Sequence, residues 1–215
     1  MAFASIESAL EVIASGGMVI VVDDEGRENE GDVVMAAEFA TSEALTFMIS
    51  KCRGIVCAPM SERTARSLEL PLMVERNTES MKTAFTVSVD LIAGVTTGVS
   101  AAERALTLRA LATPGTKPGS LARPGHIFPL IARPGGVAER AGHTEAAVDL
   151  AELAGLSPVG VICEILNDDG TMARRANLDV FARTNGLITI SIADLIVWKA
   201  ERALKSRFLS PSLVA

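Results

Sequence analysis

Aromatic residues are scarce in this chain of 215 residues: they make up 4%, tyrosine is absent and Trp198 is the single tryptophan. The core is therefore expected to be mainly aliphatic. Hydrophobic residues reach 49% and charged residues 21%, a composition typical of globular rather than disordered proteins. A chain of this length can form one substantial domain that buries roughly 70% of the surface of its extended form. We predict a single domain over residues 1–205 and a C-terminal tail over 206–215.

Cysteine is also sparse. The three cysteines, Cys52, Cys57 and Cys163, are scattered and lack the spacing of metal ligands. An odd, low count favours reduced thiols in a cytosolic protein. Cys163 lies in an apolar run, where a buried thiol is expected. Cys57 ends another such run, where it is either structural or close to a functional site.

The chain also lacks a secretory segment at its N-terminus, and no apolar run approaches the roughly 20 residues of a membrane span. There is no excess of positive charge, because the net charge is -6 at pH 7. This balance argues against sequence-independent nucleic-acid binding, which needs a basic face. We predict a cytoplasmic protein without nucleic-acid or membrane partners, whose anionic ligands, if any, bind at a locally positive site.

An acidic stretch follows the apolar run at residues 18–22. Its six carboxylates surround a single cation, Arg27, and belong to Asp23, Asp24, Glu25, Glu28, Glu30 and Asp32. A solvated turn between two strands is the simple interpretation. The alternative is a cation site, because crowded carboxylates repel unless a cation offsets them, and hard cations such as Mg²⁺ prefer oxygen ligands. Gly26 and Gly31 are expected to be the pivots of this loop.

Helical and strand patterns mix along the chain without a repeat. Apolar spacing and capping residues predict helices over 6–13, 42–50, 61–68, 100–111, 144–153 and 178–184, and a final helix containing Trp198. Strands are predicted over 18–22, 33–37, 55–58, 85–89, 159–166 and 187–192. This mixture favours an α/β (α+β) fold in which helices are layered on a mixed β-sheet.

Residues 113–143 are interrupted repeatedly by proline and glycine and are predicted to be irregular. Both histidines of the chain fall here, together with several cations and almost no acids; these are His126, His143, Lys117, Arg123, Arg133 and Arg140. A linker is the simple explanation. A long irregular stretch inside a compact domain is more often functional, however.

Two residues beside the predicted helix at 144 suggest an anion site. A helix N-terminus offers free N–H groups and a positive dipole, to which Arg140 and the Thr144 hydroxyl would add donors for a phosphate. The alternative is an ordinary junction in which Thr144 caps the helix and Arg140 is a surface charge.

His143 can supply a nitrogen ligand to a cation held by Glu28, although that donor pair suits Mn²⁺, Fe²⁺ or Zn²⁺ better than Mg²⁺ and a lone histidine is usually structural.

Two residues are candidates for proton transfer. His126 is one, because histidine titrates near neutral pH. Glu164, within an apolar strand, is the other, since a partly buried carboxyl suits a group that both takes and gives protons. The structural alternative is a buried Glu164 paired with one of the arginines.

Seven blocks occur in order over nearly the whole chain: DDEGRENEGD at 23–32, GIVC at 54–57, TAFTVSVD at 83–90, GVTTGVSA at 94–101, RPGH at 123–126, GHTE at 142–145, and Glu164 with NDDGTM at 167–172. Any one block can arise by chance, but the ordered set is specific. Together they resemble 3,4-dihydroxy-2-butanone 4-phosphate synthase, a lyase of riboflavin biosynthesis. Some relatives carry a fused GTP cyclohydrolase II domain; its cysteine cluster is missing here, so a monofunctional enzyme is expected.

The resemblance implies conversion of the sugar phosphate D-ribulose 5-phosphate to L-3,4-dihydroxy-2-butanone 4-phosphate and formate. It implies Mg²⁺ or Mn²⁺, as one ion or two, without an organic cofactor. It also implies a homodimer with a three-layer sandwich fold and sites near the subunit interface. The metal ligands would be Glu28 and His143, and the catalytic residues His126 and Glu164. The residues implied to contact substrate are Arg27, Glu28, Asp32, Arg140, Ala141, Gly142, His143, Thr144 and Glu164.

Two other functions remain compatible with the individual motifs. One is a different metal-dependent sugar-phosphate isomerase or aldolase. The other is a non-catalytic phosphate- or nucleotide-binding module on the same layered architecture.

Overall fold

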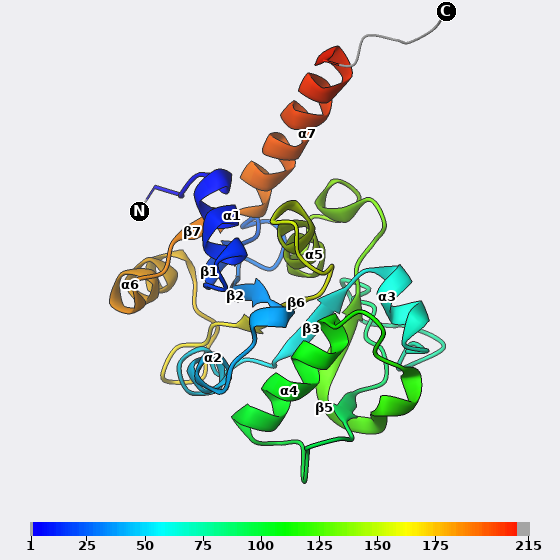
Figure 1. Cartoon of the computed structure of the whole chain (residues 1–215). Coiled ribbons are helices and arrows are strands. Elements are labelled where there is room, and N and C mark those ends of the chain that lie inside the picture. Colours follow the sequence, from blue (N-terminus) through cyan, green and yellow to red (C-terminus); the bar gives the residue numbers. More distant parts are fainter. Residues whose placement is uncertain (1, 210–215) are drawn as a thin grey trace, which may run out of the picture.

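A computed structural model describes residues 2–209, with side chains through residue 205, and its centre is a mixed seven-stranded β-sheet (Figure 1). The strand order is β4-β5-β3-β6-β2-β1-β7. The β1–β7 and β3–β5 pairs are parallel and the others antiparallel. The strands are β1 (Val19–Val22), β2 (Gly31–Ala36), β3 (Cys57–Met60), β4 (Val89–Leu91), β5 (Leu121–Ile131), β6 (Gly160–Glu164) and β7 (Thr189–Ser191).

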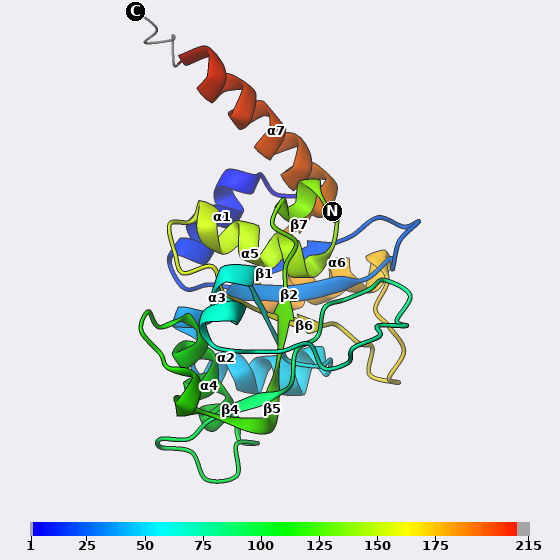
Figure 2. The same cartoon turned by 90° about the vertical axis from the view of Figure 1, so that its right-hand side faces the viewer.

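Helices cover both faces of this sheet. Within the described residues they are α1 (Ile6–Ala14), α2 (Ser42–Phe47), α3 (Glu62–Ser67), α4 (Ala101–Ala112), α5 (His143–Leu153), α6 (Arg175–Asn185) and α7 (Ile192–Leu209). Figures 1 and 2 show α1, α5 and α7 on one side of the sheet and α2 and α4 on the other. The expected α/β fold with a mixed sheet flanked by helices is confirmed.

Alternating side chains of the strands build two separate cores, which explains the layers. Val19 and Val21 of β1 pack with α1, α5 and α7, whereas Ile20 and Val22 pack on the face that α2 and α4 cover. Successive residues of a strand point to opposite faces, so a strand buried on both sides must be apolar at every position. The uninterrupted apolar run at residues 18–22 is therefore characteristic of a strand at the centre of the sheet.

The strand predicted at 85–89 is wrong for most of its length. Phe85 and Thr86 form only isolated bridges, to Leu130 and Leu72, and β4 begins at Val89. The alternation does not mark one face of a strand: Phe85 packs against one core, Val89 belongs to the other, and the polar Thr86 is fully buried.

The prediction of an irregular segment over 113–143 is wrong for residues 121–131, which form β5, the longest strand described; the residues between α4 and β5 and between β5 and α5 form turns and short 3₁₀ helices. Pro129 cannot donate a ladder hydrogen bond, but its carbonyl accepts one from the Thr86 N–H at 3.0 Å. Gly125 is required by close approach, since a Cβ there would lie 2.0 Å from the Val89 carbonyl carbon. The prolines and glycines thus mark irregularities within a strand.

The last helix, α7, continues to Leu209, beyond the predicted tail boundary at Ser206. Residues 210–215 of that tail lie outside the described residues. The C-terminal half of α7 projects away from the body of the molecule (Figure 2). Among the described helices, none is both long and apolar enough to cross a membrane.

The packing of α5 yields a stability prediction. Leu150 is fully buried, while Leu153 on the same helix is 39% exposed. Replacing Leu150 with alanine leaves a cavity and is expected to lower the free energy of unfolding by about 2–5 kcal/mol, whereas Leu153→Ala, the matched control, should cost less than about 1 kcal/mol. Urea denaturation measures both values. Equal losses in the two variants would contradict this packing.

Candidate functional site

The acidic loop between β1 and β2, residues 23–30, is built around Asp23. The Asp23 carboxylate is buried and accepts the backbone N–H groups of Glu28 at 3.0 Å and Glu30 at 2.9 Å, and it also binds Arg27 at 2.9 Å. Arg174, the N-cap residue of α6, donates to the carbonyls of Glu28 at 2.7 Å and Asn29 at 2.6 Å. The loop therefore has a defined conformation fixed from both sides.

Gly31 is not a pivot of this loop, contrary to the prediction. It lies within β2, where a Cβ would approach Leu178 Cδ1 of α6 to 2.7 Å. A glycine is needed there because the helix packs closely on the strand. Gly26 lies at the exposed tip of the loop, and its N–H donates to Asp24 at 2.7 Å.

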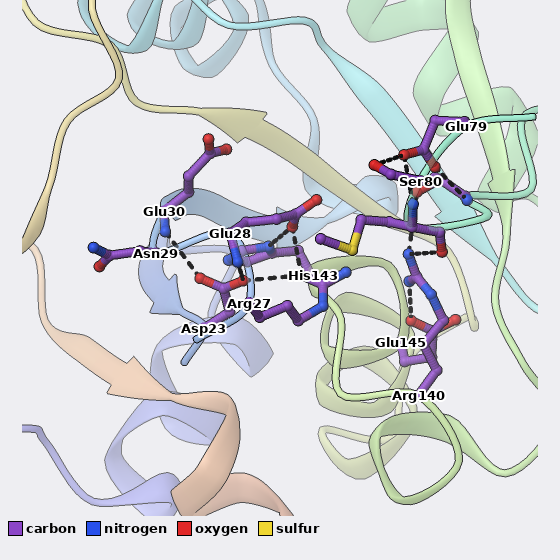
Figure 3. Close-up of polar contacts among 12 residues, drawn as sticks. Asp23, Arg27, Glu28, Asn29, Glu30, Glu79, Ser80, Arg140, His143 and Glu145 are labelled. Atoms are coloured by element: carbon purple, nitrogen blue, oxygen red, sulfur yellow. Dashed lines mark hydrogen bonds and ion pairs between the residues drawn. The ribbon is translucent and has the colours of Figure 1, made fainter. Parts of the chain in front are cut away.

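The loop presents Glu28 to His143, the first residue of α5 (Figure 3). Glu28 Oε2 lies 3.8 Å from His143 Nδ1 and also binds the Arg27 guanidinium. The interaction with His143 lowers the pKa of Glu28 despite its partial burial. Burial by itself lowers the pKa of His143, but the carboxylates of Asp32, Glu28 and Asp23 outweigh it and raise that pKa to about 9. The imidazolium form is thus a counter-ion of the acidic cluster, and a divalent cation bound to the neutral ring would take over that role.

The same cluster has donors that suit a divalent cation. Asp23, Glu28 and His143 offer ligand atoms that all lie within 4.8 Å of one another. Two ligand atoms each about 2.1 Å from a cation in octahedral geometry are about 3.0 Å apart when adjacent and about 4.2 Å apart when opposite, and the 3.8 Å between Glu28 Oε2 and His143 Nδ1 lies between these values. Both oxygens of Asp23 already accept backbone N–H groups, whereas Glu28 Oε2 and His143 Nδ1 face each other across 3.8 Å. Glu28 and His143 are therefore the better ligand candidates.

A positively charged group lies beside the acidic cluster, at the N-terminus of α5. Arg140 binds the buried Glu145 at 2.6 Å, and it donates to Thr83 Oγ1 at 3.1 Å and to the Met81 carbonyl at 3.3 Å. Figure 3 shows these contacts next to the Glu28–His143 pair. The first backbone hydrogen bond of α5 runs from Ala146 to Gly142, so the preceding N–H groups are free of that ladder. This geometry can hold a phosphate.

One cavity of about 210 Å³ joins the two groups. Of the residues predicted to form the site, those that line it are Arg27, Glu28, Asp32, Arg140, His143, Thr144 and Glu164. Asp32 and Glu164 face each other across the antiparallel β2–β6 pair. Glu164 accepts the Ile55 N–H at 2.7 Å. Burial, with Glu164, Glu28 and Glu30 nearby, raises the pKa of Asp32 well above its ordinary value, although His143 opposes this.

Three predicted residues do not line that cavity. Gly142 precedes α5 as its N-cap, where a Cβ would lie 2.4 Å from Arg140 Nη1. Ala141 lines a second cavity of about 480 Å³, which residues of the acidic loop also line. His126, in β5, is absent from the lining of the site, and its side chain is 45% exposed. The chain on its own therefore does not bring His126 to Glu164.

The cavity also includes residues that sequence reasoning did not select as site residues. Glu79, Thr83 and Phe85 lie in or beside a polar segment whose sequence is that of an ordinary loop. The sequence around Cys57 is equally consistent with a core position. Cys57 is 2% exposed, and burial raises the pKa of its thiol, which is therefore neutral. The family-like block at 83–90 was the one sequence signal that pointed to Thr83 and Phe85.

Glu79 shapes the loop at 77–83. Its carboxylate accepts the backbone N–H groups of Met81 at 2.6 Å and Thr83 at 2.9 Å, and these bonds lower its pKa to about 2. In Figure 2 this loop and the acidic loop extend from the same end of the sheet. Glu79 therefore positions the groups that hold Arg140.

Removing the Glu79 carboxylate should loosen this loop. In Glu79→Ala the amide hydrogen exchange of Met81 and Thr83 is expected to speed up by about tenfold or more, because both N–H groups lose their acceptor. The exposed neighbour Glu75→Ala is the control and should exchange as the wild type. Because the pKa of Glu79 is lowered, its carboxylate stays ionised and keeps both hydrogen bonds through the pH range in which an ordinary carboxyl takes up a proton. The wild-type loop is therefore expected to loosen only as the pH falls toward about 2. Unchanged exchange in Glu79→Ala would contradict the proposed anchoring.

Comparison with known proteins gives concordant matches. A sequence model of the 3,4-dihydroxy-2-butanone 4-phosphate synthase family matches residues 7–198. A protein of that name from Agrobacterium fabrum is 58% identical over 196 residues, which cover 91% of this chain and 92% of the relative. A Pseudomonas aeruginosa protein of the same name is 52% identical over 93% of this chain, but this chain spans only 54% of its length.

Solved structures agree with these sequence matches. The crystal structure of a 3,4-dihydroxy-2-butanone 4-phosphate synthase in complex with two magnesium ions has a TM-score of 0.89 and 42% identity, covering 93% of this chain and 98% of the other. A two-domain synthase from A. baumannii has a TM-score of 0.88 and 50% identity, covering 91% of this chain and 58% of the other. The matched region of the family model contains every residue that lines the cavity.

Proposed function

This chain belongs to the 3,4-dihydroxy-2-butanone 4-phosphate synthase family, and on this basis we propose that it converts D-ribulose 5-phosphate to L-3,4-dihydroxy-2-butanone 4-phosphate and formate. The reaction is the known activity of the family and supplies the four-carbon unit of riboflavin. We further propose that residues 1–205 form the single domain that carries this lyase activity, and that it acts in the cytoplasm.

One observation carries the proposal: a carboxylate–imidazole cluster and an arginine-lined helix N-terminus share a single cavity. D-ribulose 5-phosphate matches this arrangement, because it carries a phosphate at one end and a carbonyl and hydroxyl groups at the other. Arg140, Thr144 and the free N–H groups of α5 would bind the phosphate. The carbonyl end would then lie toward Glu28 and His143, within reach of Asp32 and Glu164.

We propose that Glu28 and His143 hold Mg²⁺, which Mn²⁺ can replace, without an organic cofactor. The relative solved in complex with two magnesium ions supports this choice. We propose one or two ions per site. When bound, such a cation polarises the substrate carbonyl and offsets the charge that develops as the ketose enolises. Arg27 and Asp32 would contact substrate, with Ala141 and Gly142 shaping the approach to Arg140.

Proton transfer is assigned to the chain's own side chains. The Ile55 N–H holds the Glu164 carboxyl in a fixed orientation at the cavity wall, where it can take a proton from the substrate's carbon chain and return it later. Asp32, opposite Glu164, can carry a proton because burial disfavours its charged form. A second group, His126, would serve departure of a hydroxyl or of formate.

His126 motivates the proposal of a homodimer. It lies outside the cavity and its side chain is half exposed. Ile92 and Val99, which are close in sequence to its neighbours Asp90 and Gly98, are exposed apolar residues. An exposed apolar patch around a potential acid–base residue is suited to an interface. We propose that a second copy of the chain packs here and that each His126 enters the site of its partner subunit.

Formate release tests the metal-dependent reaction. Purified protein with D-ribulose 5-phosphate and Mg²⁺ is expected to release formate, detected by proton NMR, and EDTA should abolish it. Glu28→Ala should lower the rate by about 100-fold or more because a metal ligand is lost. Glu25→Ala removes an exposed carboxylate of the same loop and should leave the rate unchanged. A wild-type rate in Glu28→Ala would refute the assignment of Glu28, and turnover without formate would indicate an isomerase or aldolase.

Mixing two severely impaired variants tests the shared site. Glu28→Ala and His126→Ala protomers, exchanged at equal amounts, should form mixed dimers in half of the cases, each with one intact site. About a quarter of the wild-type activity should then return. The exchange is verified by mass spectrometry of differently labelled subunits. No recovery after proven exchange would place both residues in one subunit.

A further inference from the structure

Asp90 holds His126 by two hydrogen bonds. Asp90 lies in β4 and His126 in the adjacent β5, where the pairing register shifts between Val89 and Asp90. One carboxylate oxygen accepts the His126 backbone N–H at 2.9 Å, and the other lies 2.7 Å from Nδ1 of the ring. Asp90 is 8% exposed, whereas the His126 side chain is 45% exposed. The ring is therefore anchored at one nitrogen and open at the other.

This contact determines which ring nitrogen carries the proton. An ionised carboxylate can only accept hydrogen bonds, so Nδ1 of His126 must donate. In the neutral ring the lone pair then lies on Nε2, at the exposed edge. When Nε2 takes up a proton, the Asp90 carboxylate stabilises the resulting imidazolium, as the aspartate does in Ser-His-Asp triads.

The surrounding segments enclose the pair. Gly98, with φ +82°, lies so close that a Cβ would approach Asp90 Oδ2 to 2.0 Å and His126 Nδ1 to 2.8 Å. Glu103 fixes the segment that carries Gly98, because its carboxylate accepts the N–H groups of Thr96 at 2.6 Å and Gly98 at 3.2 Å. Gly98 therefore packs directly against the Asp90 side of the ring.

One further charged group acts on Asp90 from the helix packed beside β4. Arg104 of α4 interacts electrostatically with Asp90, and its buried Nε atom has no hydrogen-bond partner. No direct bond between Arg104 and the Asp90 carboxylate competes with His126. Both Asp90 oxygens thus serve His126.

We propose that Asp90 is a positioning residue that holds His126 in the Nδ1–H tautomer, so that Nε2 is the atom that exchanges protons with the substrate. In that exchange Nε2 takes a proton from a substrate oxygen or carbon, whose bonding electrons remain on the substrate, and later returns it to the departing group. The inference rests on the catalytic assignment of His126 made above and adds the atom, the tautomer and the residue that determines both.

Nitrogen-15 NMR of the ring nitrogens tests the tautomer directly. The chain contains only two histidines, so a His143→Gln sample assigns the signals of His126. Wild-type His126 is expected as the Nδ1–H form when neutral. In Asp90→Asn the backbone bond to His126 can persist, but the amide now donates to Nδ1 and the ring should change to the Nε2–H form. An Nε2–H tautomer in the wild type would overturn the proposal without any variant at Asp90.

Kinetics test the consequence for turnover. Asp90→Asn should lower kcat for formate release by about 100-fold with little change in KM, within the range of general acid–base effects. The same substitution in a His126→Ala background should add little further loss, because Asp90 acts through His126. Asp149→Asn, a carboxylate buried to a similar degree at 6% exposure, is the control and should retain the wild-type kcat.

The outcomes separate this proposal from the proposed function. An equal loss from Asp90→Asn with and without His126 would make Asp90 merely structural and overturn the inference. If wild-type protein releases no formate but His126 has the Nδ1–H tautomer, the proposed activity fails while the assigned geometry holds. If Asp90→Asn does not fold, the tautomer of His126 in the wild-type protein still tests the proposal.

Discussion

Negative charge is concentrated at one end of the β-sheet, and the way it is offset governs how the surrounding elements are arranged. Asp23, Glu28 and Asp32 lie on or between two adjacent strands. Carboxylates this close repel unless cations and N–H donors stabilise them. The cations come from three elements: Arg27 from the loop itself, Arg174 from the start of α6 and His143 from α5. The charges and donors that offset the cluster are therefore brought to it in part by the packing of α5 and α6 on the strands.

A single carboxylate also organises each irregular segment around the site. Asp23 folds the acidic loop, Glu79 folds the loop at 77–83, and Glu103 folds the turn at 96–98, each by accepting backbone N–H groups. Asp90 does the same for His126. Acidic residues thus replace the hydrogen bonds that a regular ladder would supply, so part of the chain's net negative charge is structural.

Particular residues show how far the sequence predicts the fold. The fully apolar β1 and the capped helices could be predicted because their signals are local: each depends on the spacing of neighbouring residues. β5 could not, because Pro124, Gly125 and Pro129 ordinarily interrupt strands. Their tolerance depends on the partners of the strand, namely the Thr86 N–H that reaches Pro129 and the β4 backbone that packs on Gly125. Such contacts join residues about forty positions apart and leave no periodic trace.

The sequence by itself determined the chemistry of the site, since the ordered motifs around Glu28, Arg140, His143 and Glu164 specify both the family and the groups that meet in one cavity. Only the tertiary structure decided which of these groups lie together and which lie apart. It assigned Asp23 to the scaffold of the loop, brought Glu79 and Thr83 to Arg140, and left His126 on an exposed edge beside Asp90. The reason is physical: residue types fix which bonds a side chain can make, whereas strand register and helix packing fix which partners lie within reach.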